Sequence, residues 1–392
     1  MSRYLALLET HLSQPLLAAL NQLVDEANAA DRSLYVAGAT MRDLVAGMQA
    51  QELELVIEGE PGGLAAKVPR HLPVRLSQTT AEQHSKPGGR PKLVPASIHD
   101  YLRSRDFSVN AIALSVTRAS RGLLLDPANG TADIAARELR ALTGHTFKAH
   151  PDRMLEMLRL KVRLGFSTYP RTQAQFDEAV EAGWHRKIKH PELRAELQRV
   201  AAEPRAFEVL QAWDEAGLLS ELLPSVAGES LNTHAFAKVQ KIRQLLPYGI
   251  EFKVDESALF FNVLTDGMSA KDRAAFLASA GMESEDGAEW MKLARRVSKT
   301  EKDLASSSVQ RPSHVYGVLT KAGPTVTLLL ALRSGQRVVQ DRIRNYLTKY
   351  LPTAMEVQAG ESVARRLDAR PKRPVTPVAE AEDESVPGRA EA

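Results

Sequence analysis

Two glutamates that stand two positions apart could hold divalent metal ions. Glu52 and Glu54 flank Leu53 in a segment whose polar and apolar residues alternate, as they do in a half-buried strand. Because successive side chains of a strand point to opposite faces, this spacing puts both carboxylates on one face. Such a pair can share metal ions, and two ions can clamp the oxygens of a phosphoryl transfer. The structural alternative is the solvent-exposed face of an edge strand.

A turn of small residues lies upstream of this pair and could bind an anion. Gly38 and Ala39 follow the short apolar run 34–37 and precede Arg42 and Asp43. A small-residue turn that opens a helix presents backbone N–H groups, and the helix dipole adds to their attraction for phosphate. Arg42 could add a charge-assisted contact to phosphate. The alternative is a tight turn in which Arg42 and Asp43 pair with groups of the protein itself.

The elements that must position these residues mix helices and strands. Residues 14–29 carry their apolar side chains on one helical face and are predicted to form an amphipathic helix. Strands are predicted within 34–37, 52–57, 74–76, 110–116 and 123–125. This mixture extends to about residue 145 and indicates a compact α/β head.

The β pattern fades after residue 151, and helical patterns follow one another as far as 326–350. Within the head, segment 82–95 is rich in glycine, proline and charge and is predicted to be a mobile loop. After residue 359, a basic block is followed by an acidic block, and prolines lie between the two. Such a segment buries too little apolar surface to order itself, so we favour a solvated tail over a transient RNA or partner contact.

These patterns predict five segments of the 392-residue chain. They are an N-terminal helix over 1–30, a head over 31–148, a helical neck over 149–225, a helical body over 226–352 and a disordered charged tail over 353–392.

The composition excludes several kinds of site. The chain has no cysteine, which removes disulfides, thiolate zinc sites and cysteine nucleophiles. The net charge of +3 neither demands nor excludes nucleic acid, so a basic surface must come from local clustering. No stretch approaches the roughly 20 apolar residues of a membrane helix, and the first residues do not resemble a secretion signal. We therefore expect a cytoplasmic protein without a membrane partner.

Five motif-like segments follow one another in the order of a known family. They are Gly38-Ala39-Thr40-Met41-Arg42-Asp43, Glu52-Leu53-Glu54, Ser104-Arg105-Asp106-Phe107-Ser108-Val109-Asn110-Ala111, Asp126-Pro127-Ala128-Asn129-Gly130 and Ala149-His150-Pro151-Asp152-Arg153. Their order and spacing resemble those of the class II tRNA nucleotidyltransferase and bacterial poly(A) polymerase family over roughly residues 14–350. The resemblance implies an α/β head of the polymerase-β-like nucleotidyltransferase type, followed by an all-α neck and body.

The resemblance also implies roles for individual residues. Glu52 and Glu54 would be the catalytic pair and would hold two Mg²⁺ ions, with Glu82 as a further metal ligand. The substrate would be ATP or CTP, and Arg153 would contact its base. The remaining nucleotide-binding positions would be Gly38, Ala39, Arg42, Arg105 and Asn110.

The chain departs from the family at the metal pair and at the base-reading pair. The family's Asp-x-Asp is Glu-x-Glu here, and each side chain is one methylene longer. Mg²⁺ requires near-ideal geometry at about 2.0–2.1 Å, and a misplacement of about 1 Å can cost on the order of a hundredfold in rate. The family's base-reading Glu-Asp is Ala149-His150 here, so the same selection between C and A is not expected.

Four smaller departures concern the groups around the expected nucleotide. Ala39 replaces a glycine, Ser104 replaces an arginine, Tyr101 stands where an acidic residue is common, and Glu156 stands where the family usually has arginine. Each change weakens the match to a triphosphate site.

Two basic runs on the helical part could contact RNA phosphates. The RNA-binding candidates are Arg186, Lys187, Lys189 and Arg194 in the first run and Lys292, Arg295, Arg296 and Lys299 in the second. The alternative for either run is a solvated helix face.

Three functions remain open. The first is an RNA 3′-end nucleotidyltransferase that attaches nucleotides from NTP with Mg²⁺. The second is a catalytically degenerate paralogue that binds tRNA, another structured RNA or a protein. The third is a sensor that holds NTP without transferring it.

Overall fold

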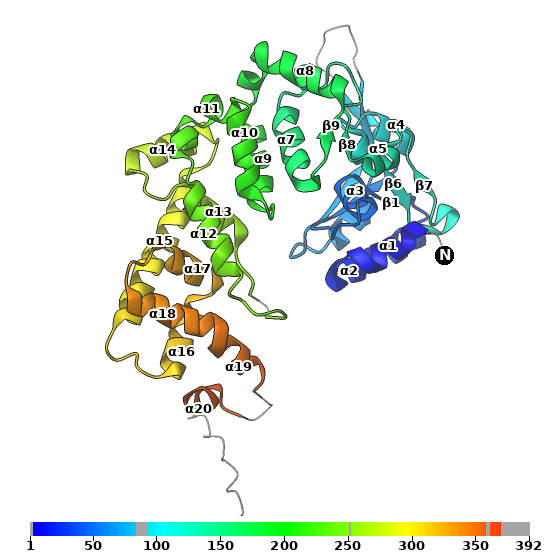
Figure 1. Ribbon diagram of the computed structural model, residues 1–392. Coiled ribbons are helices and arrows are strands. Elements are labelled where there is room, and N and C mark those ends of the chain that lie inside the picture. The colour runs from blue at the N-terminus through cyan, green and yellow to red at the C-terminus, as the bar shows by residue number, and fades with distance from the viewer. Residues whose placement is uncertain (1–2, 84–91, 251, 358–360, 370–392) are drawn as a thin grey trace, which may run out of the picture. The chain divides into compact units, whose positions relative to one another are not determined.

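The computed structural model describes residues 3–83, 92–250, 252–357 and 361–369, with the backbone alone for 82 and 83 (Figure 1). Their contacts form two units. One comprises residues 1–236 and 255–292, and the other comprises residues 237–254 and 293–392. The predicted division into head, neck and body stays a prediction.

A five-stranded sheet organises the first unit, in the order β3-β2-β1-β6-β7. Its strands are β1 (Leu34–Ala37), β2 (Leu53–Ile57), β3 (Val74–Gln78), β6 (Ala113–Ser115) and β7 (Leu124–Leu125). All five predicted strands are confirmed. Strands β2 and β3 pair in parallel, and the other neighbours pair antiparallel.

Two helices precede the sheet. They are α1 (Arg3–His11) and α2 (Gln14–Ala29), and α2 coincides with the predicted amphipathic helix. The single N-terminal helix expected over 1–30 is thus divided. Pro15 lies in the first turn of α2, where proline suits a helix start but would interrupt a continuing helix.

Helix α3 (Gly38–Val45) begins directly after β1. Thr40 is fully buried and ties this helix to the neighbouring strand β2. Its hydroxyl donates to the carbonyl of Glu52 at 3.0 Å and accepts the N–H of Glu54 at 2.7 Å. The small-residue turn is therefore fixed beside the strand that carries the two glutamates.

The rest of the first unit is mainly helical. Its principal helices are α4 (Ile98–Arg103), α5 (Gly130–Ala136), α7 (Arg153–Leu164), α8 (Pro170–Glu181), α9 (His190–Ala201), α10 (Ala206–Glu215), α11 (Leu218–Leu222), α13 (Glu256–Leu264) and α14 (Ala270–Ser279). Trp213 of α10 is fully buried, and its indole N–H donates to the carbonyl of Leu155 at 3.2 Å. This bond locks α10 against α7, which carries several charged residues of the site described below.

The predicted mobile loop over 82–95 differs in the structure. Its ends belong to two antiparallel strands, β4 (Thr80–Gln83) and β5 (Lys92–Pro95), and residues 84–91 lie outside the described chain. The side chains of Lys92 and Leu93 are exposed. These two strands are held by backbone pairing rather than by an apolar face. Their residues therefore do not alternate between apolar and polar, and the sequence pattern did not predict them.

Helix α15 (Ser284–Ala305) begins in the first unit and continues in the second. The second unit also contains α16 (Pro312–Ala322), α17 (Pro324–Arg333), α18 (Arg337–Asn345), a π-helical turn (Tyr346–Tyr350), α19 (Leu351–Met355) and α20 (Val363–Asp368). The helix predicted over 326–350 is thus interrupted around Gly335.

The predicted tail over 353–392 is helical in part. Helix α20 packs against α16, and the Asp368 carboxylate accepts the Ser313 N–H at 2.9 Å and the Ser313 hydroxyl at 2.6 Å. These bonds lower the pKa of Asp368. A carboxylate at a helix start is favourable because it satisfies N–H groups that have no partner within the helix.

No single helix in the described ranges is long and apolar enough to cross a membrane. Helices α16 and α17 together have the length and apolar composition of a membrane span, but the chain bends by 108° between them.

Replacement of Thr40 by valine tests the link between α3 and β2. Valine keeps the shape but leaves a part-buried carbonyl and a part-buried N–H without their partner, so we expect a loss of about 1 kcal/mol in the free energy of unfolding. Urea unfolding measures the loss. Thr40→Ser keeps the hydroxyl and should retain most of the stability; equal losses in both variants would contradict this role.

Candidate functional site

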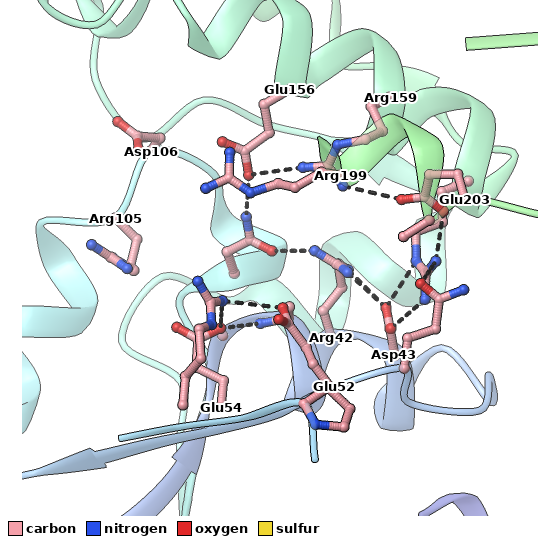
Figure 2. Close-up of a pocket in the computed structure, with 18 of the residues that line it drawn as sticks. Arg42, Asp43, Glu52, Glu54, Arg105, Asp106, Glu156, Arg159, Arg199 and Glu203 are labelled. Carbon is pink, nitrogen blue, oxygen red and sulfur yellow. Dashed lines mark hydrogen bonds and ion pairs between the residues drawn. The ribbon is translucent and has the colours of Figure 1, made fainter. Parts of the chain in front are cut away.

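A cavity of about 330 Å³ in the first unit brings the predicted residues together (Figure 2). The predicted catalytic pair and all six predicted nucleotide-binding residues line it. Its walls also carry seven arginines and six carboxylates: Arg42, Arg75, Arg105, Arg153, Arg159, Arg163, Arg199, Asp43, Glu52, Glu54, Asp106, Glu156 and Glu203. The charges in the wall nearly cancel, so the cavity is not strongly selective for anions.

Glu54 occupies the small-residue turn that the sequence assigns to phosphate. Its Oε2 accepts the N–H of Ala39 at 3.0 Å. Gly38 has a φ of +56°, and a Cβ there would lie 2.3 Å from the same oxygen. Glycine suits this position because it adopts this backbone conformation without strain and leaves room for the carboxylate where it lies. The N–H at the start of α3 is thus satisfied by the protein.

Arg75 lies beside both glutamates and was missed by the sequence analysis. It is on β3, directly opposite Glu54 in the parallel register with β2. Its Nη2 is 3.1 Å from Oε1 of Glu52 and 3.5 Å from Oε2 of Glu54. The alternation around Val74–Leu76 predicted the strand, but only the pairing of β2 with β3 identifies the partner of Arg75.

The described side chains alone do not complete the two-Mg²⁺ site that the resemblance implies. Within the described chain, no group of three or more His, Cys, Asp or Glu side chains could hold a metal ion. Glu82 belongs to β4 by its backbone, and its side chain lies outside the described part. The two remaining carboxylates already accept N–H groups from Ala39 and Arg75.

Arg42 is paired within the protein, as the structural alternative for this turn expects. It is 4% exposed. Its Nε and Nη2 lie 2.9 and 2.8 Å from Oδ1 of Asp43, and its Nη1 donates to Oδ1 of Asn110 at 2.9 Å. The Asn110 amide in turn donates to Oε1 of Glu156 at 3.2 Å. Two predicted nucleotide-binding residues, Arg42 and Asn110, therefore bind one another.

Arg153 is surrounded by carboxylates. It lies 2.5 Å from Asp106, 2.8 Å from Asp152 and 3.2 Å from Glu156. Burial alone would lower its pKa, and the three carboxylates together raise it. This guanidinium is fixed in its charged form and has few donors left for a base.

Arg105 differs from its neighbours because one of its donors is unused. Its guanidinium lies 4.6 Å from the ring centre of Tyr101, and Nη1 donates to the Tyr101 hydroxyl at 3.2 Å. The buried Nε has no hydrogen-bond partner among the described residues. Arg105 also lines a second cavity of about 790 Å³, which Arg75 lines as well.

Helix α7 holds the far wall through two further arginines. Arg159 lies 2.5 Å from Glu196 and 3.2 Å from Glu203. Arg163 lies 2.5 Å from Asp43 and 2.7 Å from Glu203. Both arginines fall within the predicted helical neck, but the sequence does not indicate these partners, because each of these four ion pairs joins residues at least 37 positions apart.

Glu156 lies at the centre of this charged cluster. Burial would raise its pKa, and the guanidiniums of Arg153, Arg159, Arg199 and Arg42 together lower it. Its charged form therefore stabilises the folded state. The acidic replacement that the sequence marks as a departure serves to balance arginines of the protein.

The first predicted RNA-binding run is largely neutralised by acidic neighbours. Arg186 lies 2.5 Å from Glu221, Lys189 lies 3.3 Å from Glu192, and Arg194 lies 3.2 Å from Asp286. The ammonium of Lys187 lies 3.7 Å from the ring centre of Trp184.

The second run lies on α15 and is less neutralised. Lys292 is 2.5 Å from Glu289, and Arg296 donates to the carbonyl of Ala322 at 2.8 Å. Arg295 and Lys299 are exposed. No acidic partner is found for these two within the described chain.

Comparison with known proteins gives a consistent set of relatives. The chain is 25% identical over 339 residues to an A-adding tRNA nucleotidyltransferase of Aquifex aeolicus, covering 80% of this chain and 40% of the relative. It is 31% identical over 245 residues to a CC-adding tRNA nucleotidyltransferase of Deinococcus radiodurans, covering 56% and 64%. The chain thus spans less than two thirds of either relative. No protein-family model matches it.

Solved structures share the fold. A tRNA nucleotidyltransferase complexed with a primer tRNA and an incoming ATP analog superposes with a TM-score of 0.57 and 22% identity, covering 85% of this chain and 99% of that one. A structure described as tRNA-processing enzyme complex 3 gives 0.57 and 21%, covering 88% and 98%. The expected α/β head followed by a helical part is confirmed.

Replacement of Glu156 by glutamine tests the charge balance of the cluster. The loss of a buried carboxylate beside arginines should lower the free energy of unfolding at pH 7 by about 3 kcal/mol. A lowered pKa stabilises the fold above the unfolded-state pKa, and this contribution disappears as the pH falls through the folded-state pKa. The difference between variant and parent should therefore be constant near neutral pH and shrink below about pH 4.

Urea unfolding at several pH values measures this difference. Glu208→Gln is the matched control, since Glu208 pairs with Arg205 on an exposed surface and its loss should cost at most about 1 kcal/mol. A pH-independent difference for Glu156→Gln would contradict the assignment.

Proposed function

Since the chain belongs to the class II tRNA nucleotidyltransferase family, we propose that it binds the 3′ end of tRNA or a similar structured RNA without transferring nucleotides. The observation that carries the proposal is the contact between Glu54 and the N–H of Ala39. In this turn the protein supplies the anion that a nucleotide would otherwise supply.

The charge balance of the cavity supports the same proposal. A triphosphate would have to displace Glu54 from Ala39 and draw Arg42 away from Asp43 and Asn110. Removal of one partner from a buried ion pair is costly, because the other charge stays buried without compensation. Arg153 is held by three carboxylates and would need a similar rearrangement.

The RNA is proposed to contact exposed cations of α15. Three predicted RNA-binding residues of this helix, Arg295, Arg296 and Lys299, are exposed without an acidic neighbour in the described chain. Arg296 donates to the carbonyl of Ala322, so Arg295 and Lys299 are the two proposed to contact phosphates. Phosphate contacts of lysine and arginine supply most non-specific RNA affinity and make it dependent on salt. The proposed ligand is a tRNA end because the two relatives are named for adding nucleotides to tRNA.

A second candidate is an active nucleotidyltransferase. It is favoured by one observation: the predicted catalytic pair and every predicted nucleotide-binding residue line one cavity. With Ala149 and His150 in place of the base-reading acids, relaxed or poly(A)-type addition would be easier to support than ordered CCA addition.

An incorporation assay separates these candidates. The protein is incubated with tRNA lacking its terminal CCA, labelled ATP or CTP, and Mg²⁺ or Mn²⁺. We expect no incorporation above the level of Glu54→Ala, together with retention of the tRNA on a filter. Incorporation that Glu54→Ala abolishes would establish the active enzyme instead, and NTP binding without RNA retention would indicate a nucleotide sensor.

The double variant Arg295→Ala/Lys299→Ala tests the RNA surface. Loss of two phosphate contacts should weaken tRNA binding about tenfold at moderate salt and reduce the slope of log K against log salt by about 1.5. Lys292→Ala is the matched control, because Glu289 already neutralises that lysine. An equal effect in the control, or none in the double variant, would exclude this face of α15.

A further inference from the structure

We infer that Arg75 is the resident cation of the Glu52–Glu54 pair and takes the place of a divalent metal ion. The inference deepens the proposed function, since it gives a physical cause for the absence of nucleotidyl transfer. It concerns the occupant of the site, so metal binding tests it without RNA or nucleotide.

The sheet places Arg75 where a shared cation would lie. Glu52 precedes β2 and Glu54 is within it, and the parallel register puts Arg75 directly opposite Glu54. A single nitrogen, Nη2, is 3.1 Å from Oε1 of Glu52 and 3.5 Å from Oε2 of Glu54. One guanidinium group thus bridges the two carboxylates, as a bound metal would.

The other groups around the pair also disfavour a metal ion. Oε2 of Glu54, the oxygen that faces Arg75, also accepts the N–H of Ala39, so it already has two donors of the protein. Arg105 lines the same cavity and lies against Tyr101, a phenol that brings no negative charge. Mg²⁺ needs about six oxygens at about 2.0–2.1 Å, and this arrangement offers two carboxylates beside two guanidiniums.

The exposure of Arg75 decides how it acts. Its side chain is 56% exposed, and an ion pair this exposed is weak by itself. A metal ion could therefore separate Arg75 from the glutamates, but the guanidinium is anchored on β3 and would stay nearby. Repulsion between the two cations would then lower the affinity for the metal. The charge of Arg75, rather than the strength of its bonds, excludes the ion.

Mn²⁺ binding to the full chain, followed by electron paramagnetic resonance, tests the inference. We expect Arg75→Ala to bind Mn²⁺ at least tenfold more tightly than the parent, because the competing charge is gone. Arg75→Glu should bind more tightly still, since it adds a third carboxylate opposite Glu54. Arg75→Ala/Glu52→Gln should lose the gain, which locates the bound ion at the pair.

Two controls separate the site from general electrostatics. Arg70→Ala removes the same charge from the wall of the neighbouring cavity and should leave Mn²⁺ affinity unchanged, since among the described residues Arg70 has no ion pair with Glu52 or Glu54. Arg75→Lys keeps the charge and should bind as weakly as the parent. Circular dichroism checks the fold of each variant, and Arg75→Gln replaces Arg75→Ala if the latter does not fold.

The inference is overturned if the parent binds Mn²⁺ as tightly as Arg75→Ala or Arg75→Gln. This outcome is distinct from failure of the proposed function. Incorporation by the parent would refute the non-catalytic role, and the ratio of Mn²⁺ affinities would still decide what Arg75 does.

Discussion

The mutual neutralisation of buried arginines and carboxylates constrains the whole first unit. A buried charge without a partner is costly, and most guanidiniums in the cavity face a carboxylate, in several cases one that belongs to another element. Asp43 of α3 binds Arg163 of α7, and Glu196 of α9 binds Arg159 of α7. These pairs hold α3 and the helical wall in one arrangement, and Thr40 links α3 to the strand with the two glutamates.

The presence or absence of an acidic partner also divides the basic residues of the helical part into two groups. Cations next to an acidic side chain, such as Arg186 beside Glu221, are already balanced. Those without such a neighbour in the described ranges, such as Arg295 and Lys299, keep their charge available to a phosphate backbone. A count of basic residues in the sequence treats both kinds alike, and the spatial partners distinguish them.

Local patterns predicted much of the fold, because they depend on neighbours in the chain. The five strands of the main sheet, α2 and the mixed head followed by helices all follow from apolar periodicity and turn residues. The partners of Arg75 and Arg163 could not be predicted, since they depend on the parallel pairing of β2 with β3 and on contacts across 120 positions. Helix α20 was missed because one side-chain cap at Asp368 helps to hold it, and that cap is not a repeating pattern.

Gly38 shows that a glycine at the start of a helix is not by itself evidence for a nucleotide-binding turn in other proteins. Glycine before a helix is commonly taken to signal that a nucleotide approaches the backbone closely. Here the missing Cβ makes room for the carboxylate of Glu54 instead. A glycine at this position therefore indicates that some group lies close to the backbone, but it does not indicate whether that group is a phosphate or a side chain of the protein. When a strand acid is lengthened by one methylene, the same glycine can persist in a molecule whose turn is closed by its own side chain.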